Sequence, residues 1–227
     1  MKVYAVIPSG GVGSRTSNPL PKQYVKFGGK EIIAYTLEVF QNSKSIDEII
    51  VAAQQEFFGF LDSIKEKYNI TKLKDPVEGG QERQYSVINA VRSLNADAED
   101  IIVVHDAVRP LLSSKILDDA IRAAKEFGGS IVALKAKDTL IKGDSEISSY
   151  LDRNEVYYVQ TPQVFKYEIF IEAVKNAEEN KFLGTDESML VYNSNYPIKI
   201  VTGSSFNFKI TSDDDMKMFD SIIKGMN

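Results

Sequence analysis

A glycine-rich segment that follows the first apolar run of the chain is the clearest candidate for chemistry. The run at residues 3–8 leads into Ser9, and Gly10, Gly11 and Gly13 follow. Glycines at the end of a strand let backbone N–H groups surround a phosphate at short range, because no Cβ keeps the ligand away. The segment therefore predicts a phosphate-binding loop, with an ordinary surface turn as the alternative.

Two cations follow this segment, and their positions indicate the kind of phosphate chemistry. Arg15 closes the segment, and Lys22 lies seven residues later. Pro19 and Pro21 keep the intervening stretch extended rather than helical, so Lys22 can return toward the phosphates. Two placed cations are what a nucleoside triphosphate requires when an oxygen attacks its α-phosphate and negative charge builds up there.

Other nucleotide-binding loops have different spacing. The Walker sequence GxxxxGK[ST] is absent, and the dinucleotide sequence GxGxxG would require glycine where Thr16 stands. A dinucleotide-binding fold also needs an acidic residue at the end of its second strand, and that strand ends here in Ala53, Gln54 and Gln55. These differences disfavour a nicotinamide-dependent dehydrogenase.

The elements that must position these residues alternate between short β-branched runs and longer stretches with helical spacing. Ser114 is the expected N-cap of the fourth helix, and Gly128 with Gly129 is expected to end it. Strands separated by helices of this length form βαβ units, so we expect an α/β fold of the Rossmann-like, doubly wound type with a mostly parallel sheet. Strands are predicted at 3–8, 48–53, 101–105, 130–134, 156–160 and 198–202, and helices at 32–40, 57–68, 83–94, 114–127, 167–179 and after 212.

Residues 135–160 interrupt this alternation. Two short strands, at 138–142 and 147–151, flank a turn at Gly143 and Asp144, which predicts a β-hairpin. We expect a single domain over residues 1–227, with this β-arm inserted at about 136–156. A hairpin that projects from an α/β core is often a dimerisation arm, and a plain surface excursion is the alternative.

Composition and charge exclude several function classes. Of 227 residues, 27 are Lys or Arg and 32 are Asp or Glu, which gives a net charge of −5 and disfavours nucleic acid or an anionic membrane as partner. The absence of cysteine excludes disulfides, thiolate zinc sites and cysteine nucleophiles. No apolar stretch has the length of a membrane helix, and no signal peptide is recognisable, so we expect a soluble, cytoplasmic protein.

Several sequence blocks, taken in order, carry a family resemblance that extends from the first strand to Lys209. Together they resemble the 2-C-methyl-D-erythritol 4-phosphate cytidylyltransferases of the non-mevalonate isoprenoid pathway. The blocks are Gly10-Gly11-x-Gly13-x-Arg15 with Pro21-Lys22-Gln23, Gly79-Gly80-Gln81-Glu82-Arg83-x-x-Ser86-Val87, His105-Asp106-Ala107-Val108-Arg109-Pro110, Leu151-Asp152-Arg153, Gln160-Thr161-Pro162-Gln163-x-Phe165, and Thr185-Asp186-Glu187.

The resemblance implies a nucleotidyltransferase-type fold and an enzyme that transfers CMP from CTP to 2-C-methyl-D-erythritol 4-phosphate with release of pyrophosphate. It implies Mg²⁺, with Asp106 as a candidate ligand, and a homodimer in which the β-arm completes the partner's site. The implied catalytic residues are Arg15, Lys22, Arg153 and Lys209. The implied nucleotide-binding residues are Ser9, Gly10, Gly11, Gly13, Gly80, Gln81, Arg83 and Ser86. The implied acceptor-binding residues are Asp106, Arg109, Thr139, Arg153, Thr161, Thr185 and Lys209.

Departures from the family pattern leave two alternatives open. Ser9-Gly10 stands where methylerythritol phosphate enzymes usually have two alanines, and Gly10-Gly11 is closer to ribitol-5-phosphate cytidylyltransferases, which make CDP-ribitol. Glu82, the Asp152-Arg153 pair and Thr185-Asp186-Glu187 favour the methylerythritol branch. A non-catalytic, nucleotide-binding regulatory protein is the alternative of another class, and it is disfavoured because the charged residues of the implied site are intact. The one histidine, His105, is expected to be structural rather than a general base.

Overall fold

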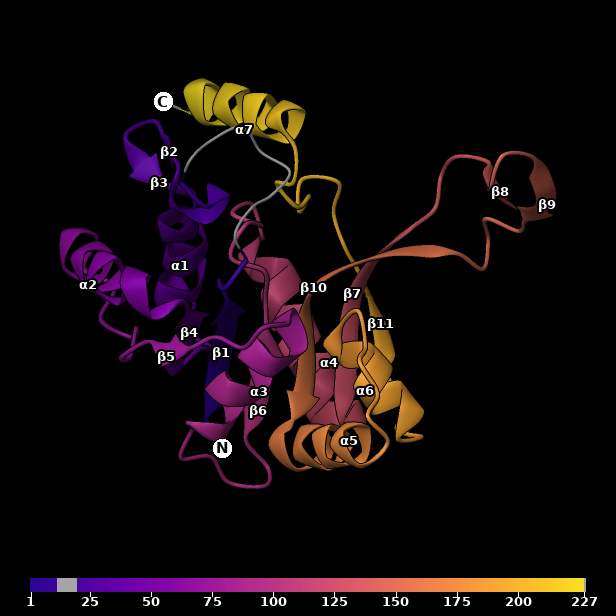
Figure 1. Cartoon of the computed structure of the whole chain (residues 1–227), viewed down its shortest axis with the longest axis horizontal. Coiled ribbons are helices and arrows are strands. Elements are labelled where there is room, and N and C mark those ends of the chain that lie inside the picture. The colour runs from indigo at the N-terminus through magenta and orange to yellow at the C-terminus, as the bar shows by residue number, and fades with distance from the viewer. Residues whose placement is uncertain (12–19, 227) are drawn as a thin grey trace.

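A seven-stranded sheet forms the centre of the computed structural model, which describes residues 1–11 and 20–226 (Figure 1). Neighbouring strands are parallel except at β10, which is antiparallel to both of its neighbours. This architecture confirms the predicted α/β fold with a mostly parallel sheet. The strand order is β11 (Lys199–Thr202), β7 (Gly129–Lys135), β10 (Tyr157–Lys166), β6 (Ile101–Val104), β1 (Val3–Pro8), β4 (Glu48–Ala53) and β5 (Val77–Glu78).

Helices cover both faces of this sheet, and the alternation of side chains along β1 shows how. Ala5 and Ile7 belong to the apolar cluster on one face, while Tyr4 and Val6 belong to the cluster on the other. The first face packs against α1 (Ile32–Asn42), α2 (Phe58–Lys67) and α4 (Ser114–Phe127), and the second against α3 (Arg83–Arg92), α5 (Tyr167–Glu179) and α6 (Glu187–Asn193).

The limits of α4 test the predicted capping residues. The expectation that Ser114 caps the helix is wrong, because Ser113 has the extended backbone of an N-cap and its side chain accepts a hydrogen bond from the Ile116 amide at 3.3 Å. Gly128 ends the helix as predicted, with φ of 87° in the left-handed region that glycine tolerates.

Strand β10 is longer than the predicted strand at 156–160. It continues through Pro162 to Lys166, with a shift in register to β7 between Val159 and Gln163. Proline lacks the N–H that a strand interior needs, so the sequence pattern indicated an end where the structure has an irregularity. The continuation brings Thr161 and Gln163 into the buried centre of the sheet.

Several short elements lie outside the predicted set. They contain too few residues for apolar periodicity to reveal them. They are the hairpin of β2 (Lys26–Phe27) and β3 (Lys30–Glu31), the strand β5, the helix α6, and the 3₁₀ turns η1 (Lys22–Tyr24) and η2 (Gln55–Phe57).

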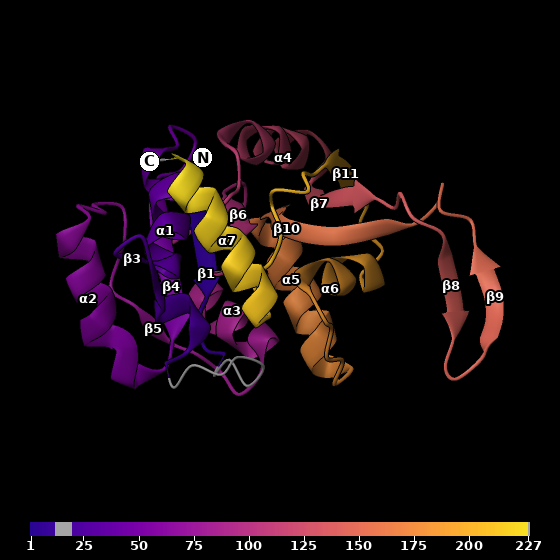
Figure 2. The ribbon, with the colours of Figure 1, turned by 90° about the horizontal axis from the view of Figure 1, so that it is seen from above.

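The predicted hairpin is present as a separate two-stranded sheet of β8 (Leu140–Gly143) and β9 (Ile147–Leu151). It projects well away from the central sheet, beyond the ends of β7 and β10 (Figures 1 and 2). Its large apolar side chains are exposed, with Ile141 at 52%, Ile147 at 55% and Tyr150 at 69%. No other part of the described chain covers these side chains.

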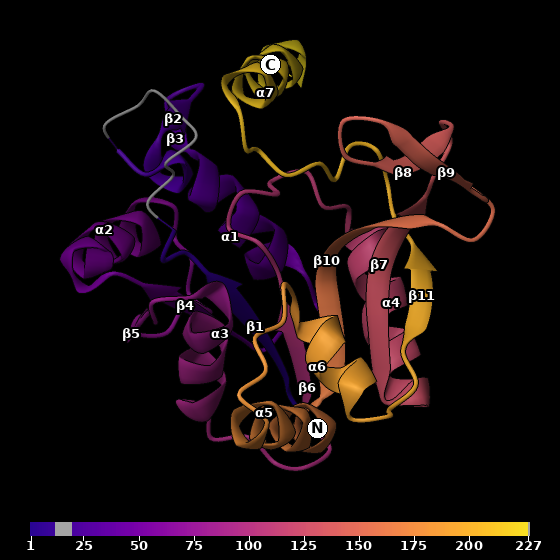
Figure 3. The same cartoon turned by 45° about the vertical axis from the view of Figure 1, so that its right-hand side comes forward.

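The C-terminal helix α7 (Asp213–Met226) packs away from the main sheet, near the start of α1. Phe219 and Ile223 of α7 form a small cluster with Ile32 and Val108. Figure 3 shows the chain crossing from β11 to α7 above the ends of the central strands. The cluster therefore anchors the segment that contains Lys209.

No helix in the described part of the chain is both long enough and apolar enough to cross a membrane.

His105 follows β6 and is buried completely, with its ring centroid 5.2 Å from that of Phe40. Nε2 lies 3.0 Å from the backbone carbonyl of Arg109, and Nδ1 lies 3.0 Å from Oγ1 of Thr161. A carbonyl only accepts, so Nε2 carries the proton and Nδ1 accepts from the hydroxyl. Burial lowers the pKa of His105 to about 4, because the charged ring would lose its hydration.

This pKa predicts a pH-dependent loss of stability. The unfolded chain binds a proton at about pH 6.5 and the folded chain only at about pH 4. The contribution of neutral His105 to the free energy of unfolding is therefore complete above pH 6.5. It is lost as the pH falls toward 4, by about 3 kcal/mol in total. Denaturant unfolding between pH 7 and 4 should show a steeper decline for the wild type than for His105→Gln. Parallel pH profiles of the two proteins would contradict the prediction.

Candidate active site

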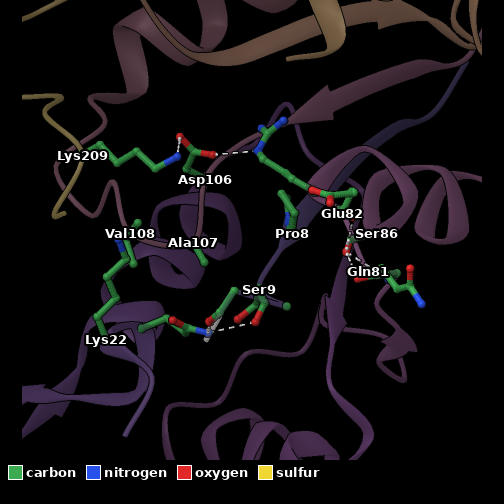
Figure 4. A pocket seen from close by; sticks show the side chains of 15 residues that line it. Pro8, Ser9, Lys22, Gln81, Glu82, Ser86, Asp106, Ala107, Val108 and Lys209 are labelled. Atoms are coloured by element: carbon green, nitrogen blue, oxygen red, sulfur yellow. Dashed lines mark hydrogen bonds and ion pairs between the residues drawn. The ribbon is translucent and has the colours of Figure 1, made fainter. Parts of the chain in front are cut away.

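Five separate segments of the chain line a pocket of about 340 Å³ at the carboxyl ends of β1 and β6 (Figure 4). Ligands of open α/β sheets bind at this edge, and the volume is that of a small-molecule site. The pocket brings together many of the residues implied by the sequence: Ser9, Gly10, Gly11, Lys22, Gly80, Gln81, Arg83, Ser86, Asp106 and Lys209. Gly13 and Arg15 lie outside the described residues.

Gln23 joins the glycine-rich rim of the pocket to the turn that presents Lys22. Its amide nitrogen donates to the backbone carbonyl of Ser9 at 2.9 Å and to that of Gly11 at 3.1 Å. The next residue, Tyr24, is buried in a stack on Phe57, with ring centroids 4.5 Å apart. The two residues that follow Lys22 thus hold it beside the glycines. Gln23 belongs to the Pro21-Lys22-Gln23 block, in which the resemblance implies a role only for Lys22.

The second glycine turn is held by Ser86. Its Oγ accepts a hydrogen bond from the Gly80 amide at 3.0 Å and donates to the Glu82 carbonyl at 3.2 Å. A side chain at position 80 would collide with Tyr85, so this turn requires glycine. A Cβ on Gly10 would stand 3.3 Å from Ser86 Oγ. The two glycine segments therefore approach each other closely, and a ligand between them would meet backbone atoms on both sides.

Asp106 lies on the other side of the pocket, and its carboxylate forms ion pairs with three cations. Its Oδ1 is 3.2 Å from Nε of Arg83, and its Oδ2 is 3.0 Å from Nε of Arg109 and 3.2 Å from Nζ of Lys209. Burial would raise the pKa of Asp106, but the charges of Arg83, Lys209 and Arg109 outweigh it and hold this pKa well below its usual range. The carboxylate is therefore ionised at any physiological pH.

Arg83, the first residue of α3, links this helix to α6. Its Nη1 donates to both carboxylate oxygens of Glu187, at 2.6 and 2.7 Å, and Glu187 is buried. Its Nη2 is buried as well and has no hydrogen-bond partner among the described residues. Glu187 belongs to the Thr185-Asp186-Glu187 block, from which the resemblance had assigned only Thr185.

The donor set around Asp106 does not fit a resident divalent cation. Both carboxylate oxygens are engaged by Arg83, Arg109 and Lys209, whose charges oppose a further cation. In the described ranges 1–11 and 20–226, no group of three or more His, Asp or Glu side chains could hold a metal. The charge of the site suits an anion instead.

Five of the implied acceptor residues do not line the pocket. Arg109 lies behind Asp106 and donates to the Asn207 carbonyl at 2.8 Å, and Thr161 is buried against His105. Thr185 is exposed at the start of α6, where its Oγ1 lies 3.1 Å from the sulfur of Met189. Thr139 and Arg153 lie at the base of the arm, and Arg153 donates to the Lys137 carbonyl at 3.0 Å.

Comparison with known proteins gives a consistent result. The chain matches the family model IspD, 2-C-methyl-D-erythritol 4-phosphate cytidylyltransferase, over residues 3–225. The cytidylyltransferase of that name from Syntrophus aciditrophicus is 38% identical over 226 residues, which cover 98% of this chain and 96% of the relative. The one from Clostridium acetobutylicum is 37% identical over 223 residues, which cover 97% of this chain and 96% of the relative.

Solved structures agree with the sequence matches. The crystal structure of 4-diphosphocytidyl-2C-methyl-D-erythritol synthase from Anaerococcus prevotii matches with a TM-score of 0.86 and 27% sequence identity. The match covers 98% of this chain and 96% of the synthase chain. The Francisella tularensis 2-C-methyl-D-erythritol 4-phosphate cytidylyltransferase has a TM-score of 0.84 and 28% identity, and covers 97% and 99% respectively. The resemblance seen in the motifs is thereby confirmed, and the chain belongs to the 2-C-methyl-D-erythritol 4-phosphate cytidylyltransferase family.

Proposed function

We propose that this protein transfers CMP from CTP to 2-C-methyl-D-erythritol 4-phosphate and releases pyrophosphate. The observation that carries the proposal is the pocket itself, in which the two glycine turns and Lys22 share one cavity with Asp106 and Lys209. A nucleotide held between the glycine turns would direct its phosphates toward the lysines. An anionic acceptor beside Lys209 could then approach the α-phosphorus.

The proposed reaction needs positioning and charge more than proton transfer. An oxygen of the acceptor phosphate attacks the α-phosphorus of CTP, the new P–O bond forms, and the bond to the β-phosphate oxygen breaks. The attacking oxygen is already anionic, so no general base is required. His105 accordingly has no part in proton transfer, since it is buried, neutral at pH 7 and hydrogen-bonded at both nitrogens.

The proposed roles follow the two sides of the pocket. Lys22, with Arg15 from outside the described residues, stabilises the negative charge that develops on the phosphates. Lys209 and Arg153 hold the acceptor phosphate, and Asp106 holds its hydroxyl groups. The remaining proposed nucleotide contacts are Ser9, Gly10, Gly11, Gly13, Gly80, Gln81, Arg83 and Ser86, and the remaining proposed acceptor residues are Arg109, Thr139, Thr161 and Thr185.

We propose that magnesium enters as part of the substrate, bound to the phosphates of CTP, because the protein donors do not form a cage for it. CTP is a metabolite of the cell interior, which favours a cytoplasmic enzyme.

We also propose one domain over residues 1–227 with the arm inserted at about 136–156, and a homodimer formed through that arm. Thr139 and Arg153 lie at the base of the arm and do not line the pocket of their own chain. The exposed Ile141, Ile147 and Tyr150 suit burial against a second copy. In such a dimer each arm would complete the acceptor side of the partner's site.

Pyrophosphate release tests the proposed function. The purified protein is supplied with CTP and Mg²⁺ and with either 2-C-methyl-D-erythritol 4-phosphate or ribitol 5-phosphate. We expect release with the first acceptor only. Release with ribitol 5-phosphate alone would keep the mechanism and reject the acceptor, and CTP binding without release for either acceptor would favour a regulatory protein.

Replacement of Lys22 tests the charge stabilisation. Lys22→Ala should lower kcat by about 10²- to 10³-fold, because it removes a cation from the transition state, while the thermal unfolding midpoint stays close to that of the wild type. Lys44→Ala, which removes an exposed lysine on the loop before β4, is the matched control and should keep full activity. A kcat near that of the wild type for Lys22→Ala would remove this residue from the mechanism.

Mixed dimers test the contribution of the arm. Arg153→Ala should raise the KM for the acceptor far more than the KM for CTP, and at low acceptor concentration each of Lys22→Ala and Arg153→Ala should be nearly inactive. Chains of the two variants, unfolded and refolded together, should recover about a quarter of wild-type activity, since half of the dimers then contain one intact site. Activity no higher than the sum of the separate variants would place each site within one chain.

A further inference from the structure

We infer that Asn207 is a positioning residue, which holds the segment that carries Lys209 and thereby fixes this lysine beside Asp106. The inference rests on the proposed function, in which Lys209 holds the acceptor phosphate. It adds a residue that the resemblance does not assign. The segment in question connects β11 to α7 and comprises residues 203–212.

The connecting segment has no helix or strand of its own. At one end the backbone amide of Gly203 donates to the Ala133 carbonyl at 2.9 Å, and at the other end that of Ile210 donates to the Val108 carbonyl at 3.0 Å. Between these two anchors, two side-chain amides join the segment to the sheet, one from the segment and one from β10. The path of the backbone that leads to Lys209 therefore depends on those amides.

Asn207 supplies the first amide and is completely buried. Its Nδ2 donates to the Thr161 carbonyl at 2.7 Å and to Oε1 of Gln160 at 3.3 Å. Its backbone amide donates to the Ser204 carbonyl at 3.0 Å, and its backbone carbonyl accepts from Nη1 of Arg109 at 2.8 Å. Asn207 thus contacts β10, the loop after β6 and its own segment at once.

Gln160 of β10 supplies the second amide, and its partners determine its orientation. Nε2 donates to the Ser204 carbonyl at 2.9 Å, and this oxygen can only accept. Oε1 therefore faces Asn207 and accepts from its Nδ2, so the two amides are oriented consistently. A Cβ at position 203 would overlap with Oε1 of Gln160, so Gly203 allows this amide to lie against the segment.

These hydrogen bonds act on two cations that share one oxygen of Asp106. Oδ2 of Asp106 lies 3.0 Å from Nε of Arg109 and 3.2 Å from Nζ of Lys209 (Figure 4). The lysine side chain is 35% exposed, and an ion pair with a partly exposed lysine restrains this long side chain only weakly. Asn207 binds Arg109 directly and lies two residues before Lys209. Its buried hydrogen bonds therefore fix the backbone from which Lys209 reaches the pocket.

Loss of the Asn207 amide should reduce the precision with which Lys209 is placed. The Thr161 carbonyl and the Gln160 amide oxygen would each lose a donor in a buried place, and the segment would gain freedom between its two anchors. A less precisely placed cation holds the acceptor phosphate less well. The glycine turns proposed to hold CTP keep their own hydrogen bonds.

The first experiment measures Lys209 directly and needs no turnover. The protein is treated with a trace of acetic anhydride, and mass spectrometry gives the acetylation of Lys209 relative to that of the exposed Lys44. In the wild type we expect Lys209 to react more slowly, because it is paired with Asp106 and partly buried. Asn207→Ala should raise the ratio by about threefold or more, because the segment then opens locally.

An unchanged ratio in Asn207→Ala would overturn the inference. Gln160→Ala is the second variant, because it removes one acceptor of the Asn207 amide and the donor to the Ser204 carbonyl. It should also raise the ratio, by a smaller factor. If Asn207→Ala does not fold, an unchanged ratio in Gln160→Ala overturns the inference instead.

A control separates positioning from a general loss of stability. Asn176→Ala removes another amide, whose Nδ2 donates to Oγ of Ser194 at 3.1 Å, between α5 and the end of α6. It should lower the unfolding temperature and leave the acetylation ratio of Lys209 unchanged. A rise in this control equal to that in Asn207→Ala would show that any destabilisation exposes Lys209, and would overturn the inference.

The second experiment is a double-mutant cycle on steady-state kinetics. Asn207→Ala should lower kcat/KM for the acceptor by about 10- to 100-fold, with the KM for CTP changed by no more than about twofold. In a Lys209→Met background the same change should cost no more than about threefold, because Asn207 acts through Lys209. Losses that multiply would show that Asn207 acts independently of Lys209, and would overturn the inference. Absence of turnover in the wild type would refute the proposed function, and the acetylation ratio would still decide the inference.

Discussion

Three cations from different parts of the chain meet at one buried carboxylate, that of Asp106, and the arrangement of the pocket depends on this contact. Arg83 is the first residue of α3, Arg109 comes from the loop after β6, and Lys209 from the segment that precedes α7. Burial of one charge is unfavourable, and burial of several like charges without a counterion is more so. Without Asp106 the three cations would repel each other, and in the described chain Arg83 alone would keep a second carboxylate, that of Glu187. The Asp106 carboxylate thus holds the positive charges of Arg83, Arg109 and Lys209 close together at the pocket.

The topology explains why the arm and the pocket start from the same edge of the sheet. Parallel strands end at the same edge of a sheet, and β1 and β6 supply the pocket there. Strand β10 is antiparallel to both β6 and β7, so its first residues lie at that same edge. The chain therefore leaves β7 for the arm and returns into β10 at that edge. One reversed strand in an otherwise parallel sheet joins the arm to the same edge as the pocket and also places the Thr161 hydroxyl against the Asp106 backbone amide.

The sequence predicted those features that depend on local spacing. The alternation of strands and helices and the two glycine turns depend on residues that are close in sequence, and the structure places Gly10, Gly80 and Ser86 together in the pocket. Contacts between distant side chains had no such signal. The pairing of Glu187 with Arg83 joins residues 104 positions apart, and Asn207 joins Arg109 across 98 positions. From sequence alone, a glutamate at the start of a helix is expected at the surface, and only the folded structure shows that Glu187 is buried.

The position of α7 has a consequence for how the site can fail. This helix contributes none of the pocket-lining residues in the described chain, yet Phe219 and Ile223 hold it against Ile32 and Val108. The segment with Lys209 is fixed at one end by β11 and at the other by this small apolar cluster. Undocking of a peripheral helix requires less free energy than global unfolding, because few contacts are broken. Release of α7 alone would therefore free one end of the segment that contains Lys209 while the central sheet stays folded.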